Sequence, residues 1–354
     1  MIPLPAPASL AGRFVTPEDP LWSEMLRAVA HDFYHLPEYV RLAAEWEGGE
    51  PYAYVYGDGT RGMLLPLVVR EAEAGRDAAT PYGYPSPVFT RPDDAELHRE
   101  ALGAYAVDGR AVGLTTTFAR LHPVLQASAP GGEAWTVIDN GETVAVTLDR
   151  EPDAWLAAMR KGHRYEIRRL RRKGYTVRLD DERDWEPFCA VYLNTMERLG
   201  ASASYRFSQD YFSRLRLALG PALHWAAVLD AGGDVAAAGL FPVVGSLMQY
   251  HLSGTAADHQ ALSPSKLMLA EVGAWARERG VEVFHLGGGV GGARDSLYAF
   301  KAGFSGDTVP FRTLRVVHDR VAFDELSARW LAEHGADAFP DPTFFPPYRQ
   351  RSDG

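Results

Sequence analysis

The sequence of 354 residues has one cysteine, Cys189, and no apolar run of the length that crosses a membrane. A lone cysteine forms no internal disulfide and cannot supply a metal site built on several thiolates. A spanning helix needs about 20 mostly apolar residues, so we expect no stable membrane insertion. The opening residues, MIPLPAP, contain neither a basic segment nor an unbroken apolar one, and this predicts no secretory signal. Together these absences favour a cytoplasmic protein.

Signals for metal-dependent and nucleophilic chemistry are equally weak. His31 and His35 have the spacing of one helix face, but no third ligand near them completes a zinc site. The sequence contains no Gly-x-Ser-x-Gly elbow, and Cys189 lies in an apolar stretch without a neighbouring cation, where thiols are usually inert. We therefore expect no metal site, no nucleophilic hydrolase and no resident cofactor.

Positive charge is scarce overall but concentrated in one place. The formal net charge is −10, which excludes a surface coated uniformly for nucleic acid. The segment 160–173, RKGHRYEIRRLRRK, nevertheless carries eight basic residues and one acidic residue, Glu166. A basic element in an acidic protein indicates one polyanionic ligand, and a merely solvated helix face is the alternative.

The chain has the length and composition of two globular domains, with 46% hydrophobic and 23% charged residues. Each half contains a helical stretch followed by two apolar strands around a turn rich in Gly and Asp, over 36–47 with 51–70 and over 211–219 with 224–245. Gly and Asp tolerate the positive φ angles of tight hairpin turns. We infer a duplicated α/β module with a boundary near residues 140–150.

The second half continues with a series of further elements. Its pattern predicts a strand over 246–255, a helix over 264–279 with Ser263 as N-cap, a strand over 281–286, a short helix over 293–302 and a strand over 313–318. The glycine loop 287–292 lacks the arrangement of a dinucleotide fold. Its five glycines allow the backbone to approach a ligand or another chain closely.

This order of elements resembles the second half of an acyltransferase module of the GNAT superfamily. The segment 298–304, YAFKAGF, is similar to the Tyr-x-Phe-Lys-x-Gly-Phe signature of the FemAB/FemX-like aminoacyltransferases, which build peptidoglycan cross-bridges. Residues 164–174 look like the basic helix of that family, and residues 82–88, YGYPSPV, look more weakly like one of its loops.

The resemblance implies an α/β (α+β) fold of two tandem GNAT-like domains, each with a mixed, mostly antiparallel central sheet flanked by helices. The first domain is expected over residues 1–145, with 319–354 as a segment that can complete it. The second is expected over 146–318 and carries the catalytic elements.

The acyl donor is indicated by the residues before the predicted helix at 264. CoA-dependent GNAT enzymes hold the pyrophosphate with the N–H groups of a glycine-containing loop at a helix N-terminus. Here Ser263 and Ser265 stand in the glycine positions, and Pro264 between them has no N–H. This disfavours CoA and agrees with the Fem-like branch, whose donor is aminoacyl-tRNA.

The resemblance therefore implies an N-acyltransferase that moves an aminoacyl group from charged tRNA to an amine of a phosphorylated, peptidoglycan-precursor-like acceptor. Such a reaction needs stabilisation of an oxyanion and a path for protons. The signature assigns stabilisation of the oxyanion or of a phosphate to Lys301, with Phe300 beside it. It assigns a role as acid or as orienting group to Tyr298. A surface lysine and a structural tyrosine are the alternatives.

Phosphate-binding candidates follow from helical spacing. Lys161, Arg164 and Arg168 fall on one helix face and can grip adjacent phosphates of a diphosphate acceptor or of the tRNA. Arg41, on the helix of the first half, is a further candidate for the same role.

Two other residues are candidates for contacts with the substrate. His285 stands where the family usually has an acid, so it is a candidate base, although a core histidine is the stronger interpretation. Ser253, at the end of a predicted strand, is a candidate substrate contact. Two rival functions stay open: an acyl-CoA-dependent N-acyltransferase, and a non-catalytic module that binds a phosphorylated glycan or RNA. The sequence fixes neither the transferred group, the acceptor amine nor the oligomeric state.

Overall fold

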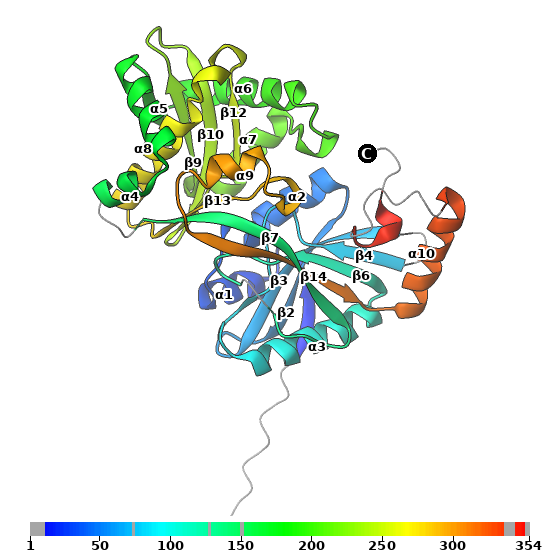
Figure 1. Ribbon diagram of the computed structural model, residues 1–354. Helices are drawn as coiled ribbons and strands as arrows, with labels where there is room; N and C mark the ends of the chain where they lie inside the picture. Colours follow the sequence, from blue (N-terminus) through cyan, green and yellow to red (C-terminus); the bar gives the residue numbers. More distant parts are fainter. Residues whose placement is uncertain (1–10, 73–74, 127–128, 149–151, 336–343, 351–354) are drawn as a thin grey trace, which may run out of the picture. The chain divides into compact units, whose positions relative to one another are not determined.

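The computed structural model describes residues 11–72, 75–126, 129–148, 152–335 and 344–350 (Figure 1). The chain divides into two compact units, Met1–Asp139 with Arg312–Gly354 and Asn140–Phe311. Two long strands, β7 (Trp135–Thr147) and β14 (Thr308–Val317), carry the chain from one unit into the other. The predicted boundaries, after residues 145 and 318, fall within β7 and directly after β14.

The first unit is built on one mixed sheet with the strand order β1-β2-β3-β4-β6-β14. Its neighbours are antiparallel except for β4 and β6, which are parallel. The strands before β14 are β1 (Gly12–Val15), β2 (Glu50–Gly57), β3 (Gly62–Ala72), β4 (Gly75–Ala79) and β6 (Leu114–Arg120), and the short β5 (Val88–Phe89) pairs with β3.

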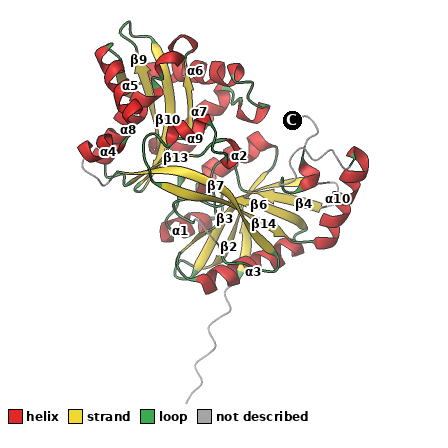
Figure 2. Cartoon of the chain, in the orientation of Figure 1, coloured by secondary structure: helices red, strands yellow, loops and turns green. Residues whose placement is uncertain are grey.

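Helices cover both faces of this sheet (Figure 2). Because side chains alternate along a strand, Ala53 and Val55 pack with α1 (Pro20–Ala28), whereas Tyr54 and Tyr56 pack with α3 (Ala95–Ala111). Burial on two faces explains why β3 reads as a continuous apolar run. The remaining helices of the unit are α2 (Pro37–Glu47) and α10 (Arg320–His334).

The C-terminal segment is held on the first unit by one buried carboxylate. Asp77 accepts hydrogen bonds from the Tyr348 hydroxyl at 2.8 Å, the Thr116 hydroxyl at 2.7 Å and the Arg349 Nε at 2.9 Å. A buried charge needs such partners to offset its lost hydration. Residues 344–350 therefore belong to the first unit, while 336–343 lie outside the described residues.

The second unit contains a sheet of the same kind, with the order β7-β13-β11-β10-β9-β8. Only β11 and β13 are parallel neighbours. Its strands after β7 are β8 (Thr176–Leu179), β9 (Leu223–Leu229), β10 (Val235–Val244), β11 (Leu247–Gln249), β12 (Leu252–Thr255) and β13 (Val283–Gly287). Its helices are α4 (Pro152–Ala158), α5 (Lys161–Arg172), α6 (Trp185–Arg198), α7 (Gln209–Leu219), α8 (Ser265–Glu278) and α9 (Ser296–Lys301). The predicted fold class, two mixed and mostly antiparallel sheets flanked by helices, is confirmed.

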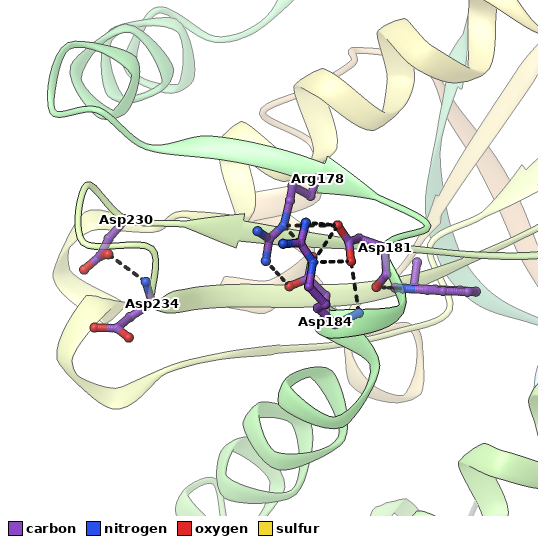
Figure 3. A network of polar contacts seen from close by, with 7 residues as sticks. Arg178, Asp181, Asp184, Asp230 and Asp234 are labelled. Carbon is purple, nitrogen blue, oxygen red and sulfur yellow. Dashed lines mark hydrogen bonds and ion pairs between the residues drawn. The ribbon is translucent and has the colours of Figure 1, made fainter.

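The repeated order of helix and hairpin is also confirmed, as α2-β2-β3 and as α7-β9-β10. The second hairpin turn is closed by Asp230, whose Oδ1 accepts the N–H of Gly232 at 2.8 Å and of Asp234 at 3.0 Å (Figure 3). Nearby, Arg178 on β8 donates to both oxygens of the buried Asp184, at 2.9 and 2.5 Å, and this pair fixes the start of α6 (Figure 3).

The predicted strand over 246–255 is corrected, because it is broken at Tyr250 and His251 into β11 and β12. The last link between this strand and β13 is the hydrogen bond from Tyr250 N–H to the His285 carbonyl at 2.9 Å. Beyond it, β12 pairs with β10 alone. The sheet of the second unit thus opens between β12 and the end of β13. In the first unit, by contrast, β4 and β6 stay paired along Arg76–Ala79.

Among the described residues, none of the helices combines the length and the apolar character that crossing a bilayer requires.

Candidate active site

The signature 298–304 occupies α9 and the turn that follows it. Asp295 caps this helix, since its carboxylate accepts the N–H of Tyr298 at 2.8 Å and of Val290 at 3.0 Å. Lys301, the last helical residue, is only 9% exposed, and its Nζ donates to the Gly288 carbonyl at 2.7 Å, directly beyond β13. The alternative of a surface lysine therefore does not hold.

The amine of Lys301 has an unusual environment. Burial lowers the pKa of Lys301 to about 8, and the carboxylate of Asp295 only partly opposes this effect. Within the described part of the chain the Gly288 carbonyl is its one hydrogen-bond partner, so two of its three N–H groups are available to another molecule. A buried amine with a shifted pKa is typical of functional sites.

The glycine loop packs against its own chain. Three of these glycines have no room for a side chain. A Cβ on Gly288 would lie 2.9 Å from the carbonyl oxygen of Glu142. A Cβ on Gly289 would lie 2.1 Å from the carbonyl oxygen of Ala293, and a Cβ on Gly292 would lie 2.2 Å from the carbonyl oxygen of Asn140. The close approach that these glycines allow is made to other residues of the same chain, which the sequence analysis did not predict. The glycines let the loop lie against Asn140 and Glu142 in the middle of β7 and place the Gly288 carbonyl where Lys301 reaches it.

Tyr298 is buried and bonded to a residue that the sequence reasoning missed. Its hydroxyl donates to Glu142 Oε2 at 3.1 Å, and the Arg294 guanidinium donates to the same oxygen at 2.5 Å. Burial and the Glu142 carboxylate raise the pKa of Tyr298. A raised pKa makes the hydroxyl of Tyr298 a weaker acid, and this favours an orienting role for Tyr298 over a role as an acid. No local motif marks Glu142, which lies far from the signature in sequence and reaches it only through the pairing of β7 with β13.

Helix α5 has one buried side and one strongly basic side. His163, Ile167 and Leu170 face the core, whereas the opposite side carries an exposed stripe of Lys161, Tyr165, Arg168 and Arg172. No ion pair to the three cations of this stripe occurs within the described residues. Arg164 is less available, because its Nη1 donates to the Ala157 carbonyl at 2.7 Å and so caps α4.

The structure brings the basic helix and the signature together. His163 Nε2 lies 2.9 Å from the Phe300 carbonyl oxygen, and the Arg160 N–H donates to the Gly303 carbonyl at 2.8 Å. A Cβ on Gly303 would lie 2.2 Å from His163 Nε2, so the ring rests directly on this glycine. The Phe300 ring, partly exposed, lies edge-on to Phe304 at 5.5 Å.

The other candidate residues have hydrogen-bond or ion-pair partners of their own. His285 is fully buried, with Nδ1 2.7 Å from Gln249 Oε1 and Nε2 2.8 Å from Thr143 Oγ1, the environment of a core histidine. Ser253 Oγ lies 2.5 Å from the Tyr250 hydroxyl, where β12 leaves the sheet edge. Arg41, in the first unit, forms an exposed ion pair with Glu18 at 2.6 Å.

The N-terminus of α8 offers few donors to an anion. Ser263 is not the N-cap that we expected, because Pro264 occupies that position and Ser263 adopts a left-handed conformation with φ 49°. The N–H groups of Ser263, Lys266 and Leu267 already donate to carbonyls at 3.0 Å each. No cluster of three or more metal-binding side chains occurs in the described ranges.

Comparisons with known proteins bear on the domain and the fold. Residues 157–302 match the family model of the acetyltransferase (GNAT) domain. No curated protein matches the sequence.

Three solved structures share the fold of nearly the whole chain. FemX has a TM-score of 0.65 at 12% identity, over 89% of this chain and 99% of its own. The C-terminal domain (DUF2156) of a putative lysylphosphatidylglycerol synthetase from Agrobacterium fabrum has a TM-score of 0.54 at 18% identity, over 88% of this chain and 96% of its own. A tandem GNAT protein from the clavulanic acid biosynthesis pathway has a TM-score of 0.50 at 12% identity, over 88% of this chain and 99% of its own. The domain match thus covers residues 157–302, less than half of the chain, and the three solved structures show that nearly the whole chain shares their fold.

Proposed function

We propose that the second unit transfers an aminoacyl group from aminoacyl-tRNA to an amine of a phosphorylated, peptidoglycan-precursor-like acceptor. The observation that carries this proposal is the buried Lys301 amine, held against the Gly288 carbonyl directly beyond β13 with two unused N–H groups. The likeness to FemX, and to a protein named for the synthesis of lysylphosphatidylglycerol, supports an aminoacyl group as the cargo.

The reaction needs one positive group near the reacting carbonyl. The acceptor amine attacks the ester carbon, a C–N bond forms, the ester C–O bond breaks, and a proton from the amine passes to the leaving oxygen. Lys301 donates its free N–H groups to the carbonyl oxygen while that oxygen carries negative charge. Such a donor in a water-poor site contributes several kcal/mol to transition-state stabilisation. A pKa of about 8 keeps the amine mostly protonated at neutral pH.

Donor choice rests on two features. Pro264 and the paired N–H groups beside it leave α8 without the cradle that a CoA pyrophosphate needs. The stripe on α5 extends about 16 Å from Lys161 to Arg172, at 1.5 Å per residue, and carries no opposing acid in the described ranges. Phosphates of the tRNA or of the acceptor fit this stripe. Because charged tRNA is cytoplasmic, we place the reaction in the cytoplasm.

The acceptor amine is a cation before it reacts, so it needs a negative partner. Glu142 supplies a carboxylate beside Tyr298 of the signature, and its Oε1 has no hydrogen-bond partner among the described residues. The hydroxyl of Tyr298 and the guanidinium of Arg294 hold its other oxygen. We assign to Glu142 Oε1 the capture of the acceptor ammonium group and the acceptance of the proton that this group loses before its nitrogen attacks.

The proposal is tested by incubating the protein with charged tRNA pools and muropeptide precursors and reading mass shifts by mass spectrometry. Wild type should add one aminoacyl residue to a precursor, and Lys301→Met should add none. Lys173→Met, the same replacement at an exposed position, is the matched control and should retain transfer at saturating donor. Equal product from wild type and Lys301→Met would remove the assigned role.

An acyl-CoA-dependent N-acyltransferase is the rival that the domain match itself favours, since the matched family is named for acetyl transfer. A thermal-shift series with acetyl-CoA separates the two. Stabilisation at micromolar acetyl-CoA would favour the rival despite Pro264. Binding of RNA or of a phosphorylated glycan with a steep salt dependence, and no transfer from any donor, would instead indicate a non-catalytic module.

A further inference from the structure

Helix α9 is too short to hold Lys301 in place by itself. It has six residues, and isolated helices shorter than about 12 residues are marginal in water. Its start is fixed by Asp295. The Phe300 carbonyl accepts the N–H of Gly303 at 3.1 Å within its own turn. The start of α5 adds two contacts: His163 Nε2 lies 2.9 Å from the Phe300 carbonyl oxygen, and the N–H of the N-cap residue Arg160 donates to the Gly303 carbonyl just beyond α9.

His163 is built into this contact from several sides. It is 5% exposed, its ring meets that of Phe304 edge-on at 4.8 Å and 74°, and Gly303 leaves the space into which the ring fits. Burial lowers the pKa of His163, so the ring is neutral at neutral pH. A carbonyl oxygen only accepts hydrogen bonds, so the proton of the neutral ring lies on Nε2, facing Phe300.

The bonded carbonyl belongs to the residue directly before Lys301. A displacement of the Phe300 carbonyl therefore moves the backbone from which the Lys301 side chain starts. We propose that His163 is a positioning residue that holds the Lys301 amine against the Gly288 carbonyl by fixing the last turn of α9. The contact between His163 and Phe300 also links the basic helix α5 to the Lys301 amine. That this amine matters for catalysis rests on the proposed function, whereas the link between His163 and Lys301 does not.

The titration of Lys301 can be followed by itself because the sequence has only four lysines: Lys161, Lys173, Lys266 and Lys301. Protein labelled with [ε-¹³C]lysine gives one titrating NMR signal for each, and the Lys301→Arg variant identifies the signal of Lys301 by its loss. In wild type that signal should titrate at about 8, below the ordinary lysine value of about 10.4. In His163→Leu it should titrate closer to the ordinary value, because the amine is no longer held away from water.

A matched pair of amide variants separates the effect of the hydrogen bond to Phe300 from the effect of the volume of the His163 side chain. The amide nitrogen of Gln reaches the place of Nε2 and can donate to Phe300, whereas that of Asn is one methylene shorter. His163→Gln should keep the low pKa of Lys301, and His163→Asn should raise it. The Asn and Gln pair decides the question if His163→Leu does not fold. An unchanged Lys301 titration in folded His163→Leu, or in both amide variants, would overturn the proposal.

Transfer assays on the same variants distinguish this proposal from the proposed function. We expect His163→Leu to lower kcat at least tenfold, with little change in KM for the donor, and His163→Gln to restore most of kcat. A shifted Lys301 titration with unchanged transfer would uphold the coupling and remove the role of the amine. Transfer that depends on Lys301, together with an unshifted titration, would uphold the function and overturn the positioning role.

Discussion

Gly303 is a residue of the signature at which a single added methyl group should have a large effect. A Cβ there would lie 2.2, 2.4 and 2.7 Å from Nε2, Cε1 and Cδ2 of His163, well inside van der Waals contact. The φ angle of Gly303 is not among the positive ones, so alanine fits the backbone and the cost is steric. Overpacking costs about 1–3 kcal/mol, and the lost bond to Phe300 adds about 1 kcal/mol.

We therefore expect Gly303→Ala to lower the free energy of unfolding by about 2–4 kcal/mol. For a unit of this size the Tm should fall by roughly 5–15 °C, measured by calorimetry. The matched control is Gly162→Ala on the same helix α5, where nothing lies within 4 Å of the added Cβ. It should leave the Tm unchanged or raise it slightly, because alanine is the better helix former.

A double-mutant cycle isolates the clash. In the His163→Ala background the ring is absent, so adding Gly303→Ala should cost less than about 0.5 kcal/mol, the usual limit for independent sites. Full stability of the single variant Gly303→Ala, or the same loss with and without the ring, would refute the packing described for His163 and the signature.

Acid should destabilise the first unit, because burial lowers the pKa of His35 to about 3 and that of His318 to about 4, against about 6.5 in the unfolded chain. The two neutral rings contribute their full stabilisation above pH 6.5, and this contribution is lost as the pH falls below that value. The free energy of unfolding, measured with urea, should therefore be about 2–4 kcal/mol lower at pH 5 than at pH 7. Equal free energies of unfolding at the two pH values would contradict these pKa assignments. Binding of charged tRNA should weaken with salt, and Arg168→Gln with Arg172→Gln should reduce the slope of log K against log salt by about 1.5. An unchanged slope, measured by filter binding, would show that the stripe on α5 does not contact the RNA.

The sequence predicted the order of elements because the signals are local. Turn residues such as Asp230 mark the hairpins by hydrogen bonds within their own loops, and the apolar strands between them follow from composition. The resemblance to FemX-like proteins is confirmed at the level of the fold by the solved structure of FemX. The signature and the basic helix both lie in the unit that contains the matched GNAT domain.

Features that depend on tertiary pairing escaped prediction. The break at Tyr250 arises because β11 pairs with β13 whereas β12 pairs with β10 alone, and nothing in residues 246–255 announces it. Ser263 has the composition of an N-cap, but its left-handed backbone moves the start of α8 beyond Pro264. Glu142 reaches Tyr298 only through the pairing of β7 with β13.

Lys301 is expected to reduce stability while it serves the reaction. Its pKa falls from 10.5 to about 8 on folding, so the unfolded chain binds the proton more tightly. The folded state loses about 3 kcal/mol at neutral pH, at about 1.4 kcal/mol per unit, and this cost disappears as the pH rises through 10.5. Replacing the amine by a methionine of similar length removes the cost, partly offset by about 1 kcal/mol for the lost bond to Gly288.

The most direct measurement is therefore a paired one on Lys301→Met, single-turnover aminoacyl transfer together with Tm. We predict a transfer rate lower by about 10²–10³, as for loss of one oxyanion donor, and a Tm that is a few degrees higher. An undiminished rate would contradict the account, and so would a loss of activity that merely accompanies a lower Tm.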